Sequence, residues 1–130
     1  AAQTYLRDSG DGSIINVASV AGVAGMGSSV PYCASKAALI NLGVTMARAL
    51  GPEIRVNTVS PGFIDGEWLK AGFGDKYDMV KGNNEKKAVL GKVSQPEDVA
   101  DAILSFITGS KLVTGQNMVC DGGALIGPKL

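Results

Sequence analysis

The sequence contains no histidine, and this absence excludes several kinds of active site. A Ser-His-Asp or Cys-His mechanism needs an imidazole as general base, and many metal centres use imidazole as a ligand. The two cysteines, Cys33 and Cys120, lie far apart and lack the spacing of metal ligands. We therefore expect both to be reduced, small and buried, with no disulfide and no metal site.

The sequence also lacks a net charge and any long apolar run. Lys and Arg number 12, as do Asp and Glu, so no charge excess indicates a nucleic-acid or anionic membrane partner. The apolar runs are shorter than the roughly 20 residues of a membrane span, and no secretory signal pattern occurs. We predict a cytoplasmic protein with one domain over residues 1–130, without nucleic-acid or membrane partners.

Two segments predict helices of different character. Residues 31–50 are apolar nearly all round, which predicts a helix that is covered on more than one side. Residues 94–108 predict an amphipathic helix with Pro96 in its first turn. Ser94 and Glu97 stand in capping-box register at its start.

Strand patterns alternate with these helices. A β-branched run, a second apolar run and a short final run predict strands at residues 13–19, 53–60 and 115–123. The order strand, helix, strand, helix, strand favours right-handed parallel crossovers. The sequence therefore predicts an α/β fold with a parallel sheet.

Residues 65–92 differ from the rest of the chain because charged residues and glycines gather there. The segment also contains Trp68, the only tryptophan. We predict a surface segment that is partly helical, covers the substrate and is poorly ordered without ligand.

Three side chains are predicted to meet at the carboxyl end of the sheet, where ligands of parallel α/β sheets bind. Ser19 ends the first predicted strand, and Tyr32 and Lys36 share one face of the next helix. A tyrosine hydroxyl becomes a useful acid or base when a nearby cation favours its phenolate, and a serine hydroxyl can hold a substrate oxygen. The three residues suit proton transfer to a carbonyl oxygen. From these residues alone, packing by Tyr32 and an extended apolar stem on Lys36 stay open as alternatives.

Four segments, in this order, resemble the second half of the short-chain dehydrogenase/reductase family: INVASVAG, PYCASKAAL, IRVNTVSPGFI and VTGQNMVCDGG. The resemblance runs from about Gly12 to Ile126 and implies the C-terminal half of a Rossmann-like, doubly wound parallel sheet. It also implies an NAD- or NADP-dependent oxidoreductase that interconverts a small-molecule carbonyl and a secondary alcohol by hydride transfer. A homo-oligomer, either a dimer or a tetramer, is implied as well.

The resemblance implies a role for each site residue. Ser19 would orient the substrate carbonyl or alcohol, and Tyr32 would donate or accept the proton. Lys36 would supply the cation beside that tyrosine and would contact the nicotinamide ribose. Cofactor contacts are implied for Tyr32, Lys36, Pro61, Gly62 and Ile64.

The sequence departs from the family in two respects. Gly66 stands where many relatives have a threonine that touches the cofactor. The family's first-half motifs TGxxxGxG and NNAG do not occur, and the chain does not begin with Met, so we expect it to be part of a longer protein. The stretch GVAGMG at 22–27 lacks the strand-turn-helix context of a phosphate loop, so we expect a structural or substrate-lining loop there.

A second function therefore stays open beside catalysis. With half of the cofactor site absent, the chain would act as a non-catalytic oligomerisation module. Its subunit contacts would be helix 31–50 and helix 94–108, which the resemblance implies as interfaces.

Overall fold

The computed structural model describes residues 1–127 and contains a parallel sheet of three strands in the order β1-β2-β3. The strands are β1 (Gly12–Val17), β2 (Ile54–Pro61) and β3 (Asn117–Cys120), and the main helices are α3 (Val30–Leu50) and α6 (Pro96–Thr108). The predicted order of strands and helices is confirmed, with boundaries that differ by up to a few residues. Residues 128–130 of the predicted domain lie outside the described part.

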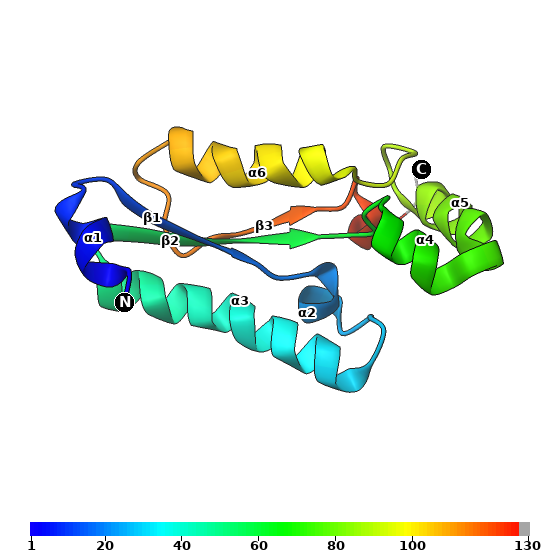
Figure 1. Ribbon diagram of the computed structural model, residues 1–130, viewed down its shortest axis with the longest axis horizontal. Helices are drawn as coiled ribbons and strands as arrows, with labels where there is room; N and C mark the ends of the chain where they lie inside the picture. The colour runs from blue at the N-terminus through cyan, green and yellow to red at the C-terminus, as the bar shows by residue number, and fades with distance from the viewer. Residues whose placement is uncertain (128–130) are drawn as a thin grey trace.

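The sheet lies between two helical layers, with α3 on one face and α6 on the other (Figure 1). The middle strand β2 is buried along all 8 of its residues. Val56 packs with Ala47 of α3, whereas Val59 packs with Val99 and Phe106 of α6. Burial of one aliphatic side chain of this kind contributes about 1.5–3 kcal/mol to the stability of the fold. Because β2 buries such side chains on both faces, it joins the two small cores into one unit. The predicted Rossmann-like α/β arrangement is confirmed.

Polar residues of β2 are buried because the segment before β3 satisfies them. The Asn57 side chain donates to the Val113 carbonyl at 3.1 Å and accepts from the Gln116 backbone N–H at 3.0 Å. The Thr114 hydroxyl oxygen accepts from the Val56 backbone N–H at 3.0 Å. The asparagine of the motif IRVNTVSPG and the threonine of VTG therefore serve to join β2 to the chain that leads into β3.

Shorter elements extend the fold at both ends of the sheet (Figure 1). They are α1 (Gln3–Asp8), α2 (Val20–Ala24), α4 (Glu67–Phe73), η1 (Gly74–Lys76), α5 (Tyr77–Lys87) and η2 (Ala124–Ile126). α4 and α5 project past the carboxyl ends of the strands. Residues 65–92 are thus largely helical, whereas the sequence predicted only partly helical structure.

Helix α3 is covered on one face only, which differs from the expectation of cover on several sides. Of its 21 residues, Gly43 and Ala47 alone are buried, while Leu42 and Val44 are more than 40% exposed. Within residues 1–127, no helix, α3 included, is long and apolar enough to cross a membrane. The apolar sequence of α3 is therefore not explained by the packing of the described chain.

The start of α6 differs from the predicted capping box. The N-cap is Gln95, and its backbone N–H donates to the Asp98 carboxylate at 2.8 Å. Ser94 lies one residue earlier and its hydroxyl donates to the Cys120 carbonyl at 3.1 Å. The predicted register of Ser94 and Glu97 is therefore wrong by one residue, because Ser94 is used to hold the end of β3. Pro96 in the first turn is confirmed.

The cap at α6 predicts a pH-dependent stability. The hydrogen bond from Gln95, with attraction from Lys92, holds the pKa of Asp98 below its usual range. Because the folded-state pKa is lowered, the charged carboxylate stabilises the fold at pH values above its unfolded-state pKa of about 3.9. This stabilisation is lost as the pH falls through the folded-state pKa. We expect Asp98→Asn to be less stable than wild type near pH 7, with the difference vanishing in acid. Urea denaturation followed by circular dichroism at several pH values measures this.

The control for that experiment is Glu97→Gln, which removes a charge from the same turn without touching the cap. A stability difference between wild type and Asp98→Asn that is the same at every pH would contradict the assignment.

Candidate active site

Ser19 lies just beyond the carboxyl end of β1 and begins helix α2. Its side-chain oxygen accepts from the backbone N–H of Ala21 at 3.2 Å, which makes Ser19 the N-cap of that helix. A serine hydroxyl also carries one donor hydrogen. Capping fixes the oxygen in place and leaves this hydrogen able to bind another oxygen.

Tyr32 and Lys36 lie in the first turns of α3, as the sequence predicted. The N-cap Ser29 accepts from the Tyr32 backbone N–H at 3.3 Å and so fixes the start of the helix. The Lys36 ammonium donates to the Val17 carbonyl at 3.0 Å and lies 5.8 Å from the centre of the Tyr32 ring. Lys36 therefore connects the tyrosine-bearing helix to the last residue of β1, two positions before Ser19.

The close approach of α2 to α3 depends on Gly22. A Cβ atom at this position would lie 2.5 Å from the Lys36 carbonyl carbon, which leaves no room for a side chain. Gly25 then ends α2 at a φ of 68°, a left-handed conformation that suits glycine. Residues 22–24 of GVAGMG therefore belong to a helix packed on α3, whereas residues 25–27 form a loop. The expectation of a loop thus holds for the second half of the stretch only. Gly25 and Gly27 also border a cleft of about 420 Å³ beside Cys33.

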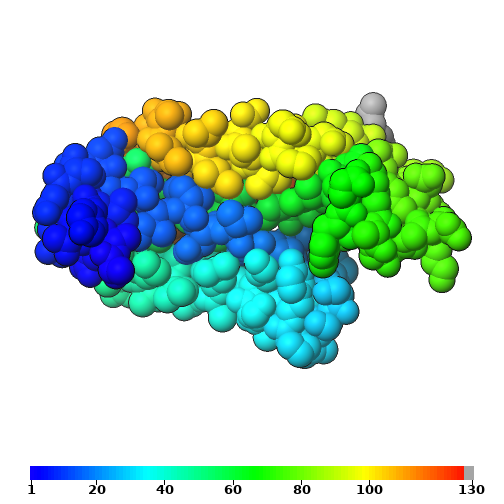
Figure 2. All heavy atoms as spheres, in the orientation of Figure 1, coloured from blue at the N-terminus to red at the C-terminus, as the bar shows by residue number. Residues whose placement is uncertain are grey.

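A second cleft, of about 370 Å³, brings several predicted site residues together. Tyr32 of α3 lines it opposite residues that follow β2 and begin α4: Gly62, Ile64, Gly66, Trp68 and Leu69. In Figure 2 the atoms of α4 (green) lie next to those of the α2–α3 region (blue to cyan), at the end of the molecule where the strands end. The cleft thus lies where ligands of parallel α/β sheets bind.

Three predicted site residues have no place in the described lining of this cleft. Ser19 follows the end of β1, Lys36 extends from α3 to the Val17 carbonyl, and Pro61 is buried at the end of β2, where it pairs with Cys120. Next to it, Gly62 packs so closely that a Cβ atom would lie 2.7 Å from that of Asp121. The lack of a side chain at Gly62 therefore lets the chain that leaves β2 pass close to Asp121 as it enters the cleft lining.

A polar cluster surrounds Asp65, a residue that no sequence pattern had indicated as functional. Its carboxylate accepts hydrogen bonds from the hydroxyl of Tyr77, from Lys81 at 2.6 Å and from Gln95 at 3.3 Å. The bonds from Lys81, Tyr77 and Gln95 hold the pKa of Asp65 far below its usual range. Asp65 stands between the cleft residues Ile64 and Gly66, so the cluster is joined to the cleft lining through the backbone at Asp65.

Tyr77 and Lys81 repeat the Y-x-x-x-K spacing of Tyr32 and Lys36, yet their surroundings are different. Burial and the Asp65 carboxylate raise the pKa of Tyr77, whose hydroxyl is already used as a donor to that carboxylate. Tyr77 is 8% exposed, whereas Tyr32 is 38% exposed and lines a cleft. The spacing was visible in the sequence, but the carboxylate that distinguishes the two pairs is brought to Tyr77 only by the fold.

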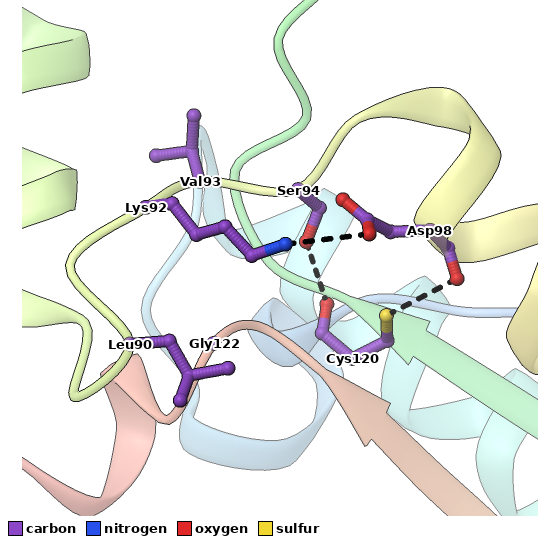
Figure 3. A pocket seen from close by; sticks show the side chains of 7 residues that line it. All are labelled: Leu90, Lys92, Val93, Ser94, Asp98, Cys120 and Gly122. Carbon is purple, nitrogen blue, oxygen red and sulfur yellow. Dashed lines mark hydrogen bonds and ion pairs between the residues drawn. The ribbon is translucent and has the colours of Figure 1, made fainter.

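Cys120 borders a small cavity of about 110 Å³ below the start of α6 (Figure 3). Its thiol donates weakly to the Asp98 carbonyl at 3.7 Å, and burial raises the pKa of the thiol. Both Cys33 and Cys120 are free, as predicted, but each is only partly buried. The contacts of Cys120 are those of a packing residue, and they do not favour a reactive thiolate.

The fold and the site define a Rossmann-like α/β protein with a tyrosine and a lysine at the carboxyl ends of its strands. Residues 1–124 match the model of a family described as enoyl-(acyl carrier protein) reductase. The short-chain dehydrogenase/reductase homolog YusR of Bacillus subtilis is 41% identical over 92% of this chain and 88% of its own length. The chain belongs to the short-chain dehydrogenase/reductase family.

Other relatives are about twice as long as the region they share with this chain. The 3-oxoacyl-(acyl-carrier-protein) reductase FabG of Thermotoga maritima is 37% identical over 94% of this chain and 49% of its own. The crystal structure of a short-chain dehydrogenase/reductase family oxidoreductase from Burkholderia thailandensis superposes with a TM-score of 0.86. It is 31% identical and covers 96% of this chain and 49% of its own. The chain thus spans about half the length of these two relatives.

Substitution of Gly22 tests whether the close contact between α2 and α3 is needed. Gly22→Ala forces a methyl group against the Lys36 backbone, which cannot yield as a flexible side chain can. We expect a loss of about 1–3 kcal/mol in unfolding free energy, the range for overpacking, and shifted amide NMR signals at Lys36 and Ala37. Urea denaturation and NMR spectra measure the two effects.

The matched control is Gly72→Ala, because a Cβ atom there meets nothing within 4 Å. Wild-type stability and an unchanged Lys36 amide signal in Gly22→Ala would show that the close contact is not needed.

Proposed function

We propose that the chain carries the proton-transfer half of an NAD- or NADP-dependent oxidoreductase that interconverts a carbonyl and a secondary alcohol. The observation that carries this proposal is the position of Tyr32. Its side chain lines a cleft beyond the carboxyl end of β2, while Lys36, one turn along α3, holds the end of β1. A hydroxyl that borders a cleft with a cation nearby suits a proton donor and acceptor.

Ser19 and Lys36 have complementary roles in this proposal. The Ser19 hydroxyl, fixed as a helix cap, has its hydrogen left to bind the substrate oxygen. The Lys36 ammonium has three donor hydrogens and uses one on Val17, so two remain for the ribose hydroxyls of the cofactor. Its positive charge also stabilises negative charge that develops on the Tyr32 oxygen during proton transfer.

The described residues fit the nicotinamide end of a dinucleotide. Ile64 offers an apolar edge, Gly62 offers bare backbone and Tyr32 offers a hydroxyl on one cleft. When bound, the cofactor supplies or accepts the hydride, while the chain orients the substrate and moves the proton. The α2 region does not fit the pyrophosphate, because its glycines pack against α3 and end a helix.

The cleft also favours a class of substrate. Leu69 and Trp68, the latter 84% exposed, give the cleft an apolar side across from Tyr32, and Gly66 leaves space where a side chain would narrow the cleft. FabG of Thermotoga maritima is named for a 3-oxoacyl group, which is a ketone. We infer a ketone or secondary alcohol with an apolar substituent as substrate.

Replacement of the tyrosine tests the proposal directly. Tyr32→Phe removes the hydroxyl and keeps the ring, so carbonyl reduction should fall by about 10²–10⁴-fold, the usual contribution of a general acid. Loss of nicotinamide absorbance during turnover measures the rate. Tyr5→Phe is the control, since Tyr5 is exposed on α1, far along the chain from the cleft. Unimpaired turnover by Tyr32→Phe would show that another group moves the proton.

A non-catalytic role in assembly is favoured by a separate observation. Leu42 on α3 and Leu104 on α6 are each about half exposed, although both belong to helices rich in apolar residues. Because α3 and α6 cover opposite faces of the sheet, they would form two different subunit contacts (Figure 1). We propose that the chain is a homo-oligomer through both helices.

Charged substitutions test this assembly. Leu42→Asp and Leu104→Asp should each reduce the molar mass measured by light scattering on a sizing column, and the double variant should be a monomer. The cause is the cost of burying an unpaired carboxylate in an apolar contact. Asn41→Asp and Ser105→Asp add the same charge at neighbouring exposed positions and serve as controls. A monomeric wild-type chain would contradict the proposal.

A further inference from the structure

Asp65 occupies a position that connects the cleft wall to the body of the protein. Its neighbours Ile64 and Gly66 both line the cleft, but the Asp65 side chain is only 14% exposed and points into the polar cluster. Its backbone N–H donates to the Ser94 carbonyl at 2.8 Å, and Ser94 in turn donates to the Phe63 carbonyl at 3.1 Å. This segment is thereby joined to the chain that leads into α6.

The carboxylate of Asp65 collects donors from two separate parts of the fold. Tyr77 and Lys81 lie on successive turns of α5, and Gln95 is the N-cap of α6. A carboxylate with three donors, one of them a cation, forms charge-assisted hydrogen bonds that are stronger than neutral ones. The Lys81 side chain is 30% exposed, so this pair is better shielded than an ordinary surface ion pair.

Aromatic contacts strengthen the same connection. The Phe63 ring lies 6.4 Å from that of Phe73 at the end of α4 and 6.1 Å from that of Tyr77. Tyr77 therefore contacts Phe63 through its ring and Asp65 through its hydroxyl. Helix α4, which carries Trp68 and Leu69, lies along the chain between Asp65 and its partner Tyr77.

We propose that Asp65 is a positioning residue that fixes, through Tyr77 and Lys81, the α4 wall of the cleft opposite Tyr32. The role rests on the proposed function, because the wall matters only if substrate binds there. The substrate side of the cleft is then formed before ligand binds. This differs from the sequence-based expectation that residues 65–92 become ordered only with ligand.

Two conservative variants of the full chain test this role. Asp65→Asn keeps the shape and loses the charge, and Tyr77→Phe keeps the ring and loses the hydroxyl. In each, we expect amide hydrogen exchange of residues 66–87 to quicken about tenfold or more, with α3 and the part of α6 beyond its first turn unchanged. The double variant should show less than the sum of the two effects, since both remove one interaction. Time-resolved fluorescence anisotropy of Trp68, the only tryptophan, should show faster local motion.

The control is Glu67→Gln, which breaks the exposed pair with Lys70 at 3.0 Å on the same helix and should leave both signals at wild-type values. Exchange within about twofold of wild type in Asp65→Asn would overturn the proposal. So would an equal rise in α3 and α6, because Asp65 would then act as a general stabiliser.

Kinetics separate this proposal from the proposed function. Asp65→Asn should raise KM about tenfold with little change in kcat, because a mobile wall weakens substrate binding, whereas Tyr32→Phe should lower kcat. A lower kcat at unchanged KM in Asp65→Asn would contradict the positioning role. Exchange and anisotropy need no turnover, so they report on Asp65 even if Tyr32 proves not to be the proton donor.

Discussion

Burial of β2 on both faces is the constraint on which the rest of the structure depends. Ile54 and Val56 belong to the α3 core and Val59 to the α6 core, so neither helix can move without exposing this strand. Burial of a whole strand also buries its polar groups, which must be satisfied within the protein. Asn57 of β2 bonds the segment that leads into β3, and Thr114 of that segment accepts from the Val56 backbone N–H of β2. The strand so buried leads directly into Gly62, which lines the cleft.

Secondary structure with a strong pattern could be predicted from the sequence. The β-branched strands, the apolar helix and the amphipathic helix each carry a local periodicity, and their order decides between parallel and antiparallel sheets. The predicted structure was wrong where a side chain that could cap its own helix bonds instead to a residue far away in the sequence. Ser94 fits a helix cap by sequence, yet its hydroxyl bonds to Cys120 of β3. A pattern within the helix could not show that partner. Residues 22–24 of GVAGMG likewise belong to a helix, and Gly22 allows its close contact with α3.

The two tyrosine-lysine pairs show why the candidate site could be predicted only in part. Spacing within a helix indicates which side chains share a face, and it placed Tyr32 and Lys36 together correctly. Spacing does not indicate what approaches from outside the helix. Lys36 reaches the Val17 carbonyl, whereas Lys81 reaches the Asp65 carboxylate, which also engages the hydroxyl of Tyr77. Tyr32 therefore lines a cleft, whereas the hydroxyl of Tyr77 is used to bind the Asp65 carboxylate.

The hydrogen bonds of Asp65 also bear on Gly66, which stands where many relatives have a threonine. A residue that grips the cofactor from this loop would hold the loop as well, and Gly66 has no side chain for either purpose. Asp65 holds the loop from behind instead, through bonds to α5 and to the start of α6. The wall of the cleft can therefore keep its position although Gly66 has no side chain. Loop position and ligand contact, which one side chain can combine, are separate in this chain, because the residue that fixes the loop does not line the cleft.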